Sequence, residues 1–320
     1  MSQTSTLAMP DLAAMPGERT HRGFEPLRPV GTSPARTFSH IDPRPIVPAL
    51  GAAVAGIDLR QPSVEAQGEL RDLLADRKVL VFRDQDLTPH QYADFLRIFG
   101  TPVKEDMVVD RNHPPEVGAI HTRPNEQQQI NFWHMDHSFR ELPTRVLSLY
   151  AKLLPPVGGD TLFASLAAAY DALSDELKEQ IEDLHCYHRV TTTQNTKRRY
   201  TKEEAEAMEK APPVIHPLVP RDPGNGRRYL FVNVPIYCRS IVELQTPEGD
   251  ALLRKLYRHV QRPEFHFRLV WRPNTVVVWE NKHTLHYPVS DYFPHERKLW
   301  RGVIDATEAD RPRAANLGQA

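Results

Sequence analysis

Helix-like and strand-like patterns of apolar and polar positions alternate along this chain. Ser63 is suited to cap a helix and precedes a stretch with helical patterning, which predicts a helix over residues 64–77. Thr88 followed by Pro89 predicts the start of a second helix, and Gly100 predicts its end. Further helices are expected at residues 167–173, 175–184 and 250–260, and after Thr201, which forms a capping-box signature with Glu204.

Short apolar runs, each about as long as a strand, lie between these helices. They are clearest in the last third of the chain, where turn-rich connections divide them. This pattern favours an antiparallel barrel or sandwich with flanking α-helices, a fold of the mainly β or α+β class. The expected strands cover residues 78–82, 146–152, 229–234, 265–271, 275–280 and 298–304.

The organisation along the chain predicts one domain between two tails. Residues 1–38 combine several prolines with small residues and lack apolar periodicity, which is typical of a flexible tail. Residues 309–320 predict a second, shorter tail. Between them we find no long linker, repeat or low-complexity tract, so a single compact domain is expected over residues 39–308.

Composition narrows the class of protein without indicating a function. The 320 residues include 40 basic and 41 acidic side chains, so no excess charge indicates binding to nucleic acid or to an anionic membrane. No apolar run is long enough for a membrane span, and the first residues do not form a secretory signal. The two cysteines, Cys186 and Cys238, exclude a disulfide framework and fit a reducing compartment. We therefore expect a cytoplasmic protein.

The segment NFWHMDHSF at residues 131–139 contains the strongest candidate for a metal site. In an extended segment, side chains two residues apart project to the same side. His134 and Asp136 can therefore offer one imidazole nitrogen and one carboxylate oxygen to the same point. With a further histidine from elsewhere in the chain they would form the facial triad of two histidines and one carboxylate. Such a triad leaves coordination positions open, as oxygen activation at iron requires.

A His-x-Asp triplet is weak evidence by itself, because a chain with 15 histidines is expected to contain about one by accident. This chain has a second triplet, His40-Ile-Asp42. That triplet is followed by Pro-Arg-Pro and lies beside the expected N-terminal tail, which is a poor place for a preorganised site. The context of each triplet therefore decides between them.

A second cluster of candidate residues follows the expected strand at 275–280. His283 and His286 are the candidates for the third metal ligand. Arg297 and Arg301 lie four residues apart, share a face of either a strand or a helix, and offer planar forks for carboxylates. An anionic co-substrate beside the metal would need such a group. Ion pairs of these arginines with surface acids are the alternative interpretation.

Four motifs follow one another in this chain. They are WHMDHSF at residues 133–139, GGDTLF at 158–163, WEN at 279–281 with His286, and Arg297 with Arg301. In order and spacing, this set resembles the TauD/TfdA family of Fe(II)/2-oxoglutarate-dependent dioxygenases, which includes taurine dioxygenase and 2,4-dichlorophenoxyacetate dioxygenase. The resemblance extends from about residue 46 to residue 304. Each motif is modest, but the four together form a specific signal.

The resemblance implies a role for each matching residue. His134, Asp136 and His286 would bind Fe(II). Thr161 and Arg297 would hold the far carboxylate of 2-oxoglutarate, which serves as co-substrate together with O2. The catalytic residues implied in this way are the three metal ligands themselves.

The resemblance also implies the fold and the reaction. The fold would be a double-stranded β-helix, or jelly roll, surrounded by helices. The reaction would convert 2-oxoglutarate to succinate and carbon dioxide while a C–H bond of a second substrate is hydroxylated. The protein would position the reactants and exclude water, while the iron and the co-substrate carry the chemistry. His283 comes three residues too early for the family spacing, so it ranks below His286.

The primary substrate is the least constrained part of the prediction. Relatives use an arginine at the place of Arg301 on an anionic group of this substrate. Lys104 is a second candidate for an anion, with a solvated surface lysine as the alternative. Lys197 lies in a basic segment, residues 194–200, where relatives often have a mobile lid, although charge runs are more often solvated. A small anionic substrate is expected, but Glu105 replaces the histidine of sulfonate-binding relatives and argues against taurine.

Two other classes of protein remain as alternatives. One is a zinc-dependent hydrolase that uses histidine and aspartate ligands, against which the Thr161 motif and the arginine pair argue. The other is a non-catalytic jelly-roll binding protein, against which the complete set of ligands argues. Neither nucleic acid nor a membrane is expected as a partner, and a homo-oligomer stays open.

Overall fold

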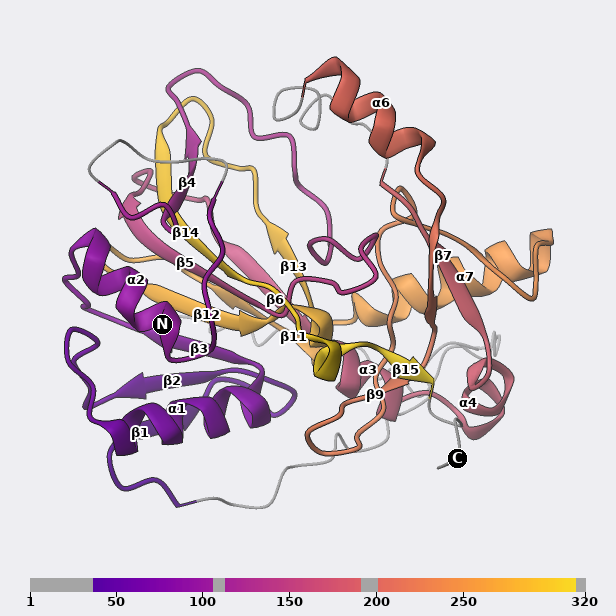
Figure 1. Cartoon of the computed structure of the whole chain (residues 1–320), viewed down its shortest axis with the longest axis horizontal. Coiled ribbons are helices and arrows are strands. Elements are labelled where there is room, and N and C mark those ends of the chain that lie inside the picture. The colour runs from indigo at the N-terminus through magenta and orange to yellow at the C-terminus, as the bar shows by residue number, and fades with distance from the viewer. Residues whose placement is uncertain (1–36, 106–112, 191–200, 315–320) are drawn as a thin grey trace, which may run out of the picture.

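The computed structural model describes residues 37–105, 113–190 and 201–314, which form sheets flanked by helices (Figure 1). The largest sheet has seven strands, and all neighbours in it run antiparallel except β2 and β3, which run parallel. In spatial order its strands are β1 (Asp42–Pro45), β2 (Ala52–Ala55), β3 (Val79–Phe82), β12 (Val276–Glu280), β5 (Val146–Leu153), β14 (Arg297–Ile304) and β4 (Gly118–Thr122).

Three smaller sheets accompany the large one, and all of their pairings are antiparallel. The first has the order β11 (His266–Leu269), β6 (Thr161–Ser165) and β13 (Thr284–Pro288). The second has the order β10 (Cys238–Ile241), β7 (His185–His188) and β8 (Val214–Pro217). The third pairs β15 (Arg313–Ala314) with β9 (Pro220–Arg221).

Helices cover the outer sides of these sheets. Helix α1 packs against β3 and β12, α2 packs against β14, and α7 packs against α3 and β10. Among the described residues, no helix has both the length and the apolar character needed to cross a membrane. The helices are α1 (Val64–Arg77), α2 (Pro89–Arg97), α3 (Leu166–Asp171), α4 (Asp175–Ile181), α6 (Lys202–Lys210) and α7 (Pro247–Val260), with short 3-10 turns η2 (Pro263–Phe265), η3 (Asn281–His283) and η4 (Glu308–Asp310).

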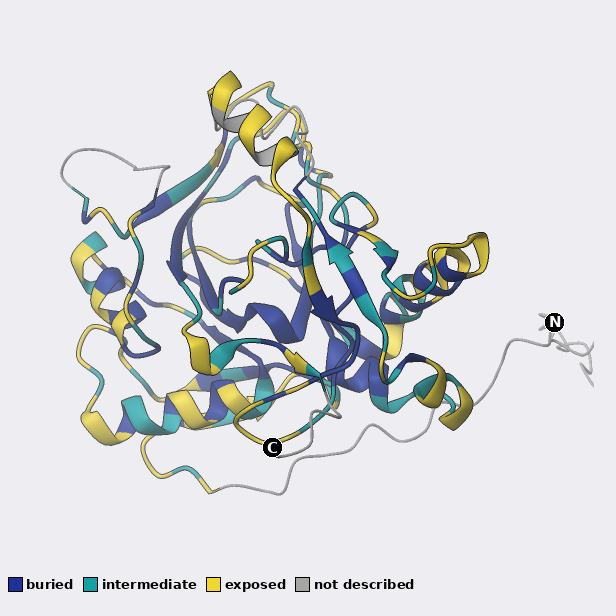
Figure 2. Cartoon of the chain, turned by 45° about the vertical axis from the view of Figure 1, so that its right-hand side comes forward, coloured by how far each residue is buried: buried dark blue, intermediate teal, exposed yellow. Residues whose placement is uncertain are grey.

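The core follows from the alternation of side chains along the strands. On β12, Val276 and Val278 face the cluster beneath helices α1 and α2, whereas Val277 and Trp279 face the smaller sheet of β11, β6 and β13. Phe163 of β6 meets Trp279 there, with ring centroids 5.2 Å apart. Burying each such side chain contributes about 1.5–3 kcal/mol. Figure 2 shows this buried interior between the strands. His286 of β13 borders it, because its ring lies 5.3 Å from that of Trp279, between centroids.

Most expected helices and strands are present, with ends that differ by a few residues. The Ser63 side chain accepts from the backbone N–H of Ala66, as predicted for the cap of α1, and Thr88 forms a capping box at α2. Lys78 was expected to begin a strand, but it ends α1 in the left-handed conformation with φ of 63°. The remaining matches are α3, α4, α6, α7, β3, β5, β11, β12 and β14.

The expected strand at residues 229–234 is wrong. These residues are buried, but their main-chain hydrogen bonds go to separate elements: Leu230 N–H donates to Leu166 at 3.2 Å and Phe231 N–H donates to Leu218 at 2.9 Å. An apolar run that is buried on all sides has the same sequence pattern in a strand and in an irregular core segment.

The end of the described chain differs from the tail expected at residues 309–320. Residues 308–314 form η4 and β15, and the buried Lys282 donates from Nζ to the carbonyl of Asp310 at 2.8 Å. Arg145 lies 3.5 Å from the Asp310 carboxylate. These long-range contacts order a polar segment that has no apolar pattern of its own. Residues 1–36 of the expected N-terminal tail lie outside the described part of the chain.

Candidate metal centre

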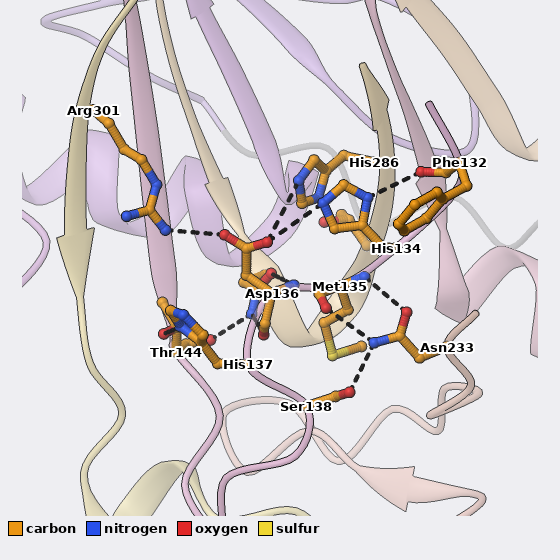
Figure 3. A network of polar contacts seen from close by, with 12 residues as sticks. Phe132, His134, Met135, Asp136, His137, Ser138, Thr144, Asn233, His286 and Arg301 are labelled. Atoms are coloured by element: carbon orange, nitrogen blue, oxygen red, sulfur yellow. Dashed lines mark hydrogen bonds and ion pairs between the residues drawn. The ribbon is translucent and has the colours of Figure 1, made fainter. Parts of the chain in front are cut away.

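His134, Asp136 and His286 converge, as Figure 3 shows. One ligand atom from each lies within 4.8 Å of the others. Oδ1 of Asp136 is 3.4 Å from Nε2 of His134 and 3.9 Å from Nε2 of His286. Two ligands at right angles around a divalent cation, each at about 2.1 Å, are roughly 3 Å apart. The three atoms therefore need only a small inward movement to share one ion.

The main chain brings the two histidines together. His134 and His286 form an isolated antiparallel bridge in which each N–H donates to the other carbonyl, at 2.9 and 2.8 Å. Their rings then lie on the same side, with centroids 4.1 Å apart. The bridge lies on one edge of β13, while the other edge of this strand pairs with β6. The His286 ring also lies 5.3 Å from that of Trp279 on β12, so the candidate metal centre borders the apolar cluster that the two sheets share.

Both imidazoles turn Nε2 toward the place where a metal ion would bind. Nδ1 of His134 lies 2.9 Å from the carbonyl of Phe132, which can accept a hydrogen bond from it, so Nε2 is the nitrogen that faces Asp136. Burial, with the neighbouring His134 ring adding to it, lowers the pKa of His286 to about 3. A neutral imidazole is the form that binds a metal ion.

The carboxylate of Asp136 is held in its charged form. Burial by itself raises the pKa of Asp136, but the hydrogen bond from His134 and the positive charge of Arg301 outweigh it and hold the pKa well below its usual range. Arg301 donates to Oδ2 at 3.0 Å, so that Oδ1 faces the two imidazoles. The guanidinium therefore orients the carboxylate as well as stabilising its charge.

Two buried asparagines hold the peptide units of this triplet. Asn233 accepts from the N–H of Met135 at 3.1 Å and donates to its carbonyl at 2.9 Å. Asn281 does the same for Asp136, at 3.0 and 2.8 Å, and also donates to the carbonyl of Thr144. The segment that carries two of the three ligands is thus clamped on either side, which fixes their geometry before an ion arrives.

We expect Asn281→Ala to weaken metal binding by about 10- to 100-fold, because partners that orient a ligand typically contribute that much to affinity. Anaerobic Fe(II) titration followed by absorption measures the effect. Asn225→Ala is the matched control, since Asn225 also accepts from a backbone N–H but lies in an exposed turn. Equal affinities of the two variants would contradict a positioning role for Asn281.

The residues expected to hold 2-oxoglutarate lie on either side of Trp271. Thr161 is buried, and its Oγ1 accepts from the Trp271 indole at 3.1 Å. The Arg297 guanidinium lies between the rings of Trp271 and Tyr292, with centroids at 5.8 and 5.7 Å. Within the described part of the chain, its buried Nε has no hydrogen-bond partner. A buried guanidinium with an unpaired N–H is costly, so this cradle fits a carboxylate ligand.

The glycines of the GGDTLF motif leave room for Arg297. Gly159 has φ of +72°, and a Cβ atom there would lie 3.1 Å from both Cδ and Nε of Arg297. Its N–H donates to Asp291 at 2.7 Å, which holds the chain over the arginine. The absence of a side chain at residue 159 therefore lets the chain pass close to the guanidinium, whereas a Cβ atom at Gly158 would meet Asp291.

The three residues expected to bind the primary substrate lie in different surroundings. Arg301 is buried beside Asp136, and it also contacts both carboxylate oxygens of Glu105, at 2.7 and 2.8 Å. Lys104 is exposed, and Lys197 with the rest of the basic segment lies outside the described residues. Their roles in substrate binding stay predictions.

The rival ligand His283 lies away from the metal centre. Its Nε2 is 3.0 Å from the carboxylate of Asp222, which also accepts from Lys78 at 2.7 Å. His40 of the other triplet contacts Glu69.

The sequence did not predict Asn233 or the contact of Glu105 with Arg301. A polar Asn inside the apolar run at residues 230–234 was the one signal in the sequence that marked Asn233.

A family model described as taurine catabolism dioxygenase TauD, TfdA family, matches residues 42–303. This chain belongs to the TauD/TfdA family. A 2,4-dichlorophenoxyacetate dioxygenase of Cupriavidus pinatubonensis, described as alpha-ketoglutarate-dependent, is 32% identical over 76% of this chain and 90% of its own length. A sulfonate dioxygenase of Saccharomyces cerevisiae, also described as alpha-ketoglutarate-dependent, is 32% identical over 83% of this chain and 66% of its own length.

Solved structures give the same result. The crystal structure of AAD-2 in complex with Mn(II) and N-oxalylglycine has a TM-score of 0.70 and 32% identity, and covers 84% of this chain and 99% of its own. A taurine dioxygenase from Burkholderia xenovorans has a TM-score of 0.71 and 29% identity, and covers 88% and 100%. The expected family, enzyme class and cofactors, Fe(II) and 2-oxoglutarate with O2, are confirmed.

Proposed function

We propose that His134, Asp136 and His286 hold the Fe(II) of this 2-oxoglutarate-dependent dioxygenase, which hydroxylates a C–H bond of a small organic molecule. The observation that carries the proposal is the convergence of the three ligand atoms within 4.8 Å, on a backbone bridge that fixes them. Three ligands on one side of an ion leave its opposite face open to the co-substrate and O2.

The same proposal assigns the co-substrate to Thr161 and Arg297. The iron and 2-oxoglutarate together supply the oxidising power for the C–H bond, with succinate and carbon dioxide as the other products. Arg297 would pair with the far carboxylate of 2-oxoglutarate and so complete the hydrogen bonding of its buried Nε. The Thr161 hydroxyl accepts from Trp271, which leaves its own O–H to donate to the same carboxylate.

The jelly-roll core is part of this proposal. The seven-stranded sheet and the sheet of β11, β6 and β13 face each other across a shared apolar cluster, which supports a double-stranded β-helix. A single catalytic domain over residues 39–308 and a cytoplasmic location likewise stay proposals. Several relatives are named for phenoxy acids or sulfonates, so organic acids are the first compounds to test as substrates.

An anaerobic titration tests the metal and co-substrate sites together. We expect the protein with Fe(II) to develop a visible metal-to-ligand charge-transfer band when 2-oxoglutarate is added, because its keto and carboxylate oxygens would chelate the ion. A zinc-dependent hydrolase would show no such band with its own ion. If the band does not form with wild-type protein that binds Fe(II), the assignment of the co-substrate site is wrong.

A succinate-release assay over a panel of small organic molecules tests the enzymatic step. Turnover that a compound stimulates, with matching amounts of succinate and hydroxylated product, is the expected result. A protein that binds Fe(II) and 2-oxoglutarate but releases no succinate with any compound would instead support the non-catalytic alternative.

A further inference from the structure

The charge of Arg301 is already balanced by carboxylates of this chain. Nη1 contacts both oxygens of Glu105, at 2.7 and 2.8 Å, and Nη2 donates to Asp136 at 3.0 Å. Arg301 thus connects Glu105 to the proposed ligand Asp136, and the side chains of Arg301 and Glu105 are 9% and 5% exposed. A buried ion pair in which one guanidinium nitrogen reaches both carboxylate oxygens is a strong, charge-assisted contact.

The fold keeps Glu105 in this place. Its backbone N–H donates to the carbonyl of Pro115 at 2.8 Å. On the neighbouring strand β4, Gly118 lies directly opposite Arg301 of β14. A Cβ atom at Gly118 would lie 2.9 Å from Cβ and 3.0 Å from Oε2 of Glu105, so the absence of a side chain at residue 118 is what lets the carboxylate reach the guanidinium.

A substrate anion at this place would bring a third negative charge to one guanidinium. Arg301 would have to be shared by Glu105, Asp136 and the incoming group, and like charges placed side by side in a desolvated site oppose binding strongly. Displacing Glu105 would instead leave that carboxylate buried without a partner, which is also costly. A group that donates a hydrogen bond would instead be favoured, because the carboxylate oxygens of Glu105 can accept it.

We infer that Glu105 determines the specificity of this site, and that it selects a primary substrate whose group beside Arg301 is a neutral or cationic hydrogen-bond donor rather than a carboxylate or sulfonate. The inference rests on the proposed function, because it concerns the second substrate of the same metal centre. An anionic group elsewhere in the substrate, beyond the reach of Arg301, is compatible with it.

Matched compounds test this inference on the wild-type protein. Phenoxyacetate, phenoxyacetamide and 2-phenoxyethylamine share one skeleton and differ in the charge of one end, and equivalent acid, amide and amine sets on alkyl skeletons extend the panel. Binding is measured by anaerobic calorimetry, with and without Fe(II) and 2-oxoglutarate. We expect the affinity for the amide or the amine to be higher than the affinity for the acid by about tenfold or more. A preference for the acids, or no preference across the panel, overturns the inference.

The variant Glu105→Gln tests whether the side chain of Glu105 causes the preference for a neutral or cationic group. It removes the negative charge and supplies an N–H, so we expect the preference to shift towards the acid by about tenfold or more. Glu182→Gln is the matched control, because Glu182 is also largely buried and paired with an arginine, Arg228. An unchanged preference in a folded Glu105→Gln protein contradicts the inference. If that variant does not fold, the wild-type comparison still decides.

The two proposals fail in different ways. Loss of the charge-transfer band in the wild-type protein would refute the proposed metal and co-substrate sites, whatever the panel shows. A normal band together with tight binding of acids would leave the proposed function intact and refute only the role of Glu105.

Discussion

Asp136→Ala is expected to abolish Fe(II) binding and to reduce turnover by about a thousandfold or more. The variant removes the only anionic ligand of the triad, and it leaves two imidazoles beside the positive charge of Arg301, which repels a cation. Anaerobic Fe(II) titration and the succinate-release assay measure the two effects. Asp136→Asn is the more conservative companion, since its amide oxygen can still accept from Arg301 while the charge is lost.

The second His-x-Asp triplet supplies a matched control. Asp42→Ala removes the carboxylate of His40-Ile-Asp42, whose side chain is exposed and pairs with Arg44 on the surface. We expect this variant to bind iron and turn over as the wild type does. Retained activity in Asp136→Ala, or equal losses in both variants, would refute the metal centre at His134, Asp136 and His286.

Arg297→Ala is expected to raise the concentration of 2-oxoglutarate needed for half-maximal binding by roughly 30- to 1,000-fold. Loss of a charged, fork-like contact to a carboxylate costs about 2–4 kcal/mol when the site is buried. The affinity of the Fe(II) centre itself should change little, because the Arg297 guanidinium lies against the rings of Trp271 and Tyr292, neither of which is a proposed ligand. The charge-transfer band, titrated with 2-oxoglutarate, separates the two affinities.

Two further variants sharpen this test. Arg297→Lys keeps the charge but loses the planar fork, so we expect an intermediate effect. Arg227→Ala removes an arginine that pairs with Asp171 away from the metal centre, and it is expected to leave the 2-oxoglutarate affinity unchanged. Normal co-substrate affinity in Arg297→Ala would move the role to Arg301.

The proximity of two of the three proposed metal ligands was predictable because its signal is local. His134 and Asp136 lie two residues apart in the sequence, and their geometry follows from an extended backbone. The third ligand is 150 positions away, and residue type alone left His283 and His286 as rivals. The resemblance favours His286 as the ligand. In the structure His286 pairs with His134, whereas His283 lies beside Asp222.

The parts that escaped prediction depend on contacts between distant segments. Glu105 and Arg301 are separated by 196 residues, and Asn233 reaches Met135 across 98. Neither contact produces a periodic pattern in the sequence.

The strands that carry Thr161 and His286 were missed for a related reason. Each is five residues long and mixes polar with apolar positions, so its strand character comes from pairing with neighbours rather than from its own pattern.

The bridge between residues 134 and 286 has a consequence for which ions the protein accepts. The pairing holds the two proposed histidine ligands in place through main-chain atoms, so a divalent ion would need no folding step to bind. Two imidazoles and one carboxylate do not select Fe²⁺ by affinity, because Co²⁺, Ni²⁺ and Cu²⁺ bind such donors more tightly. The identity of the bound ion is thus left to the supply around the protein, and preparations grown in different media will carry different metals.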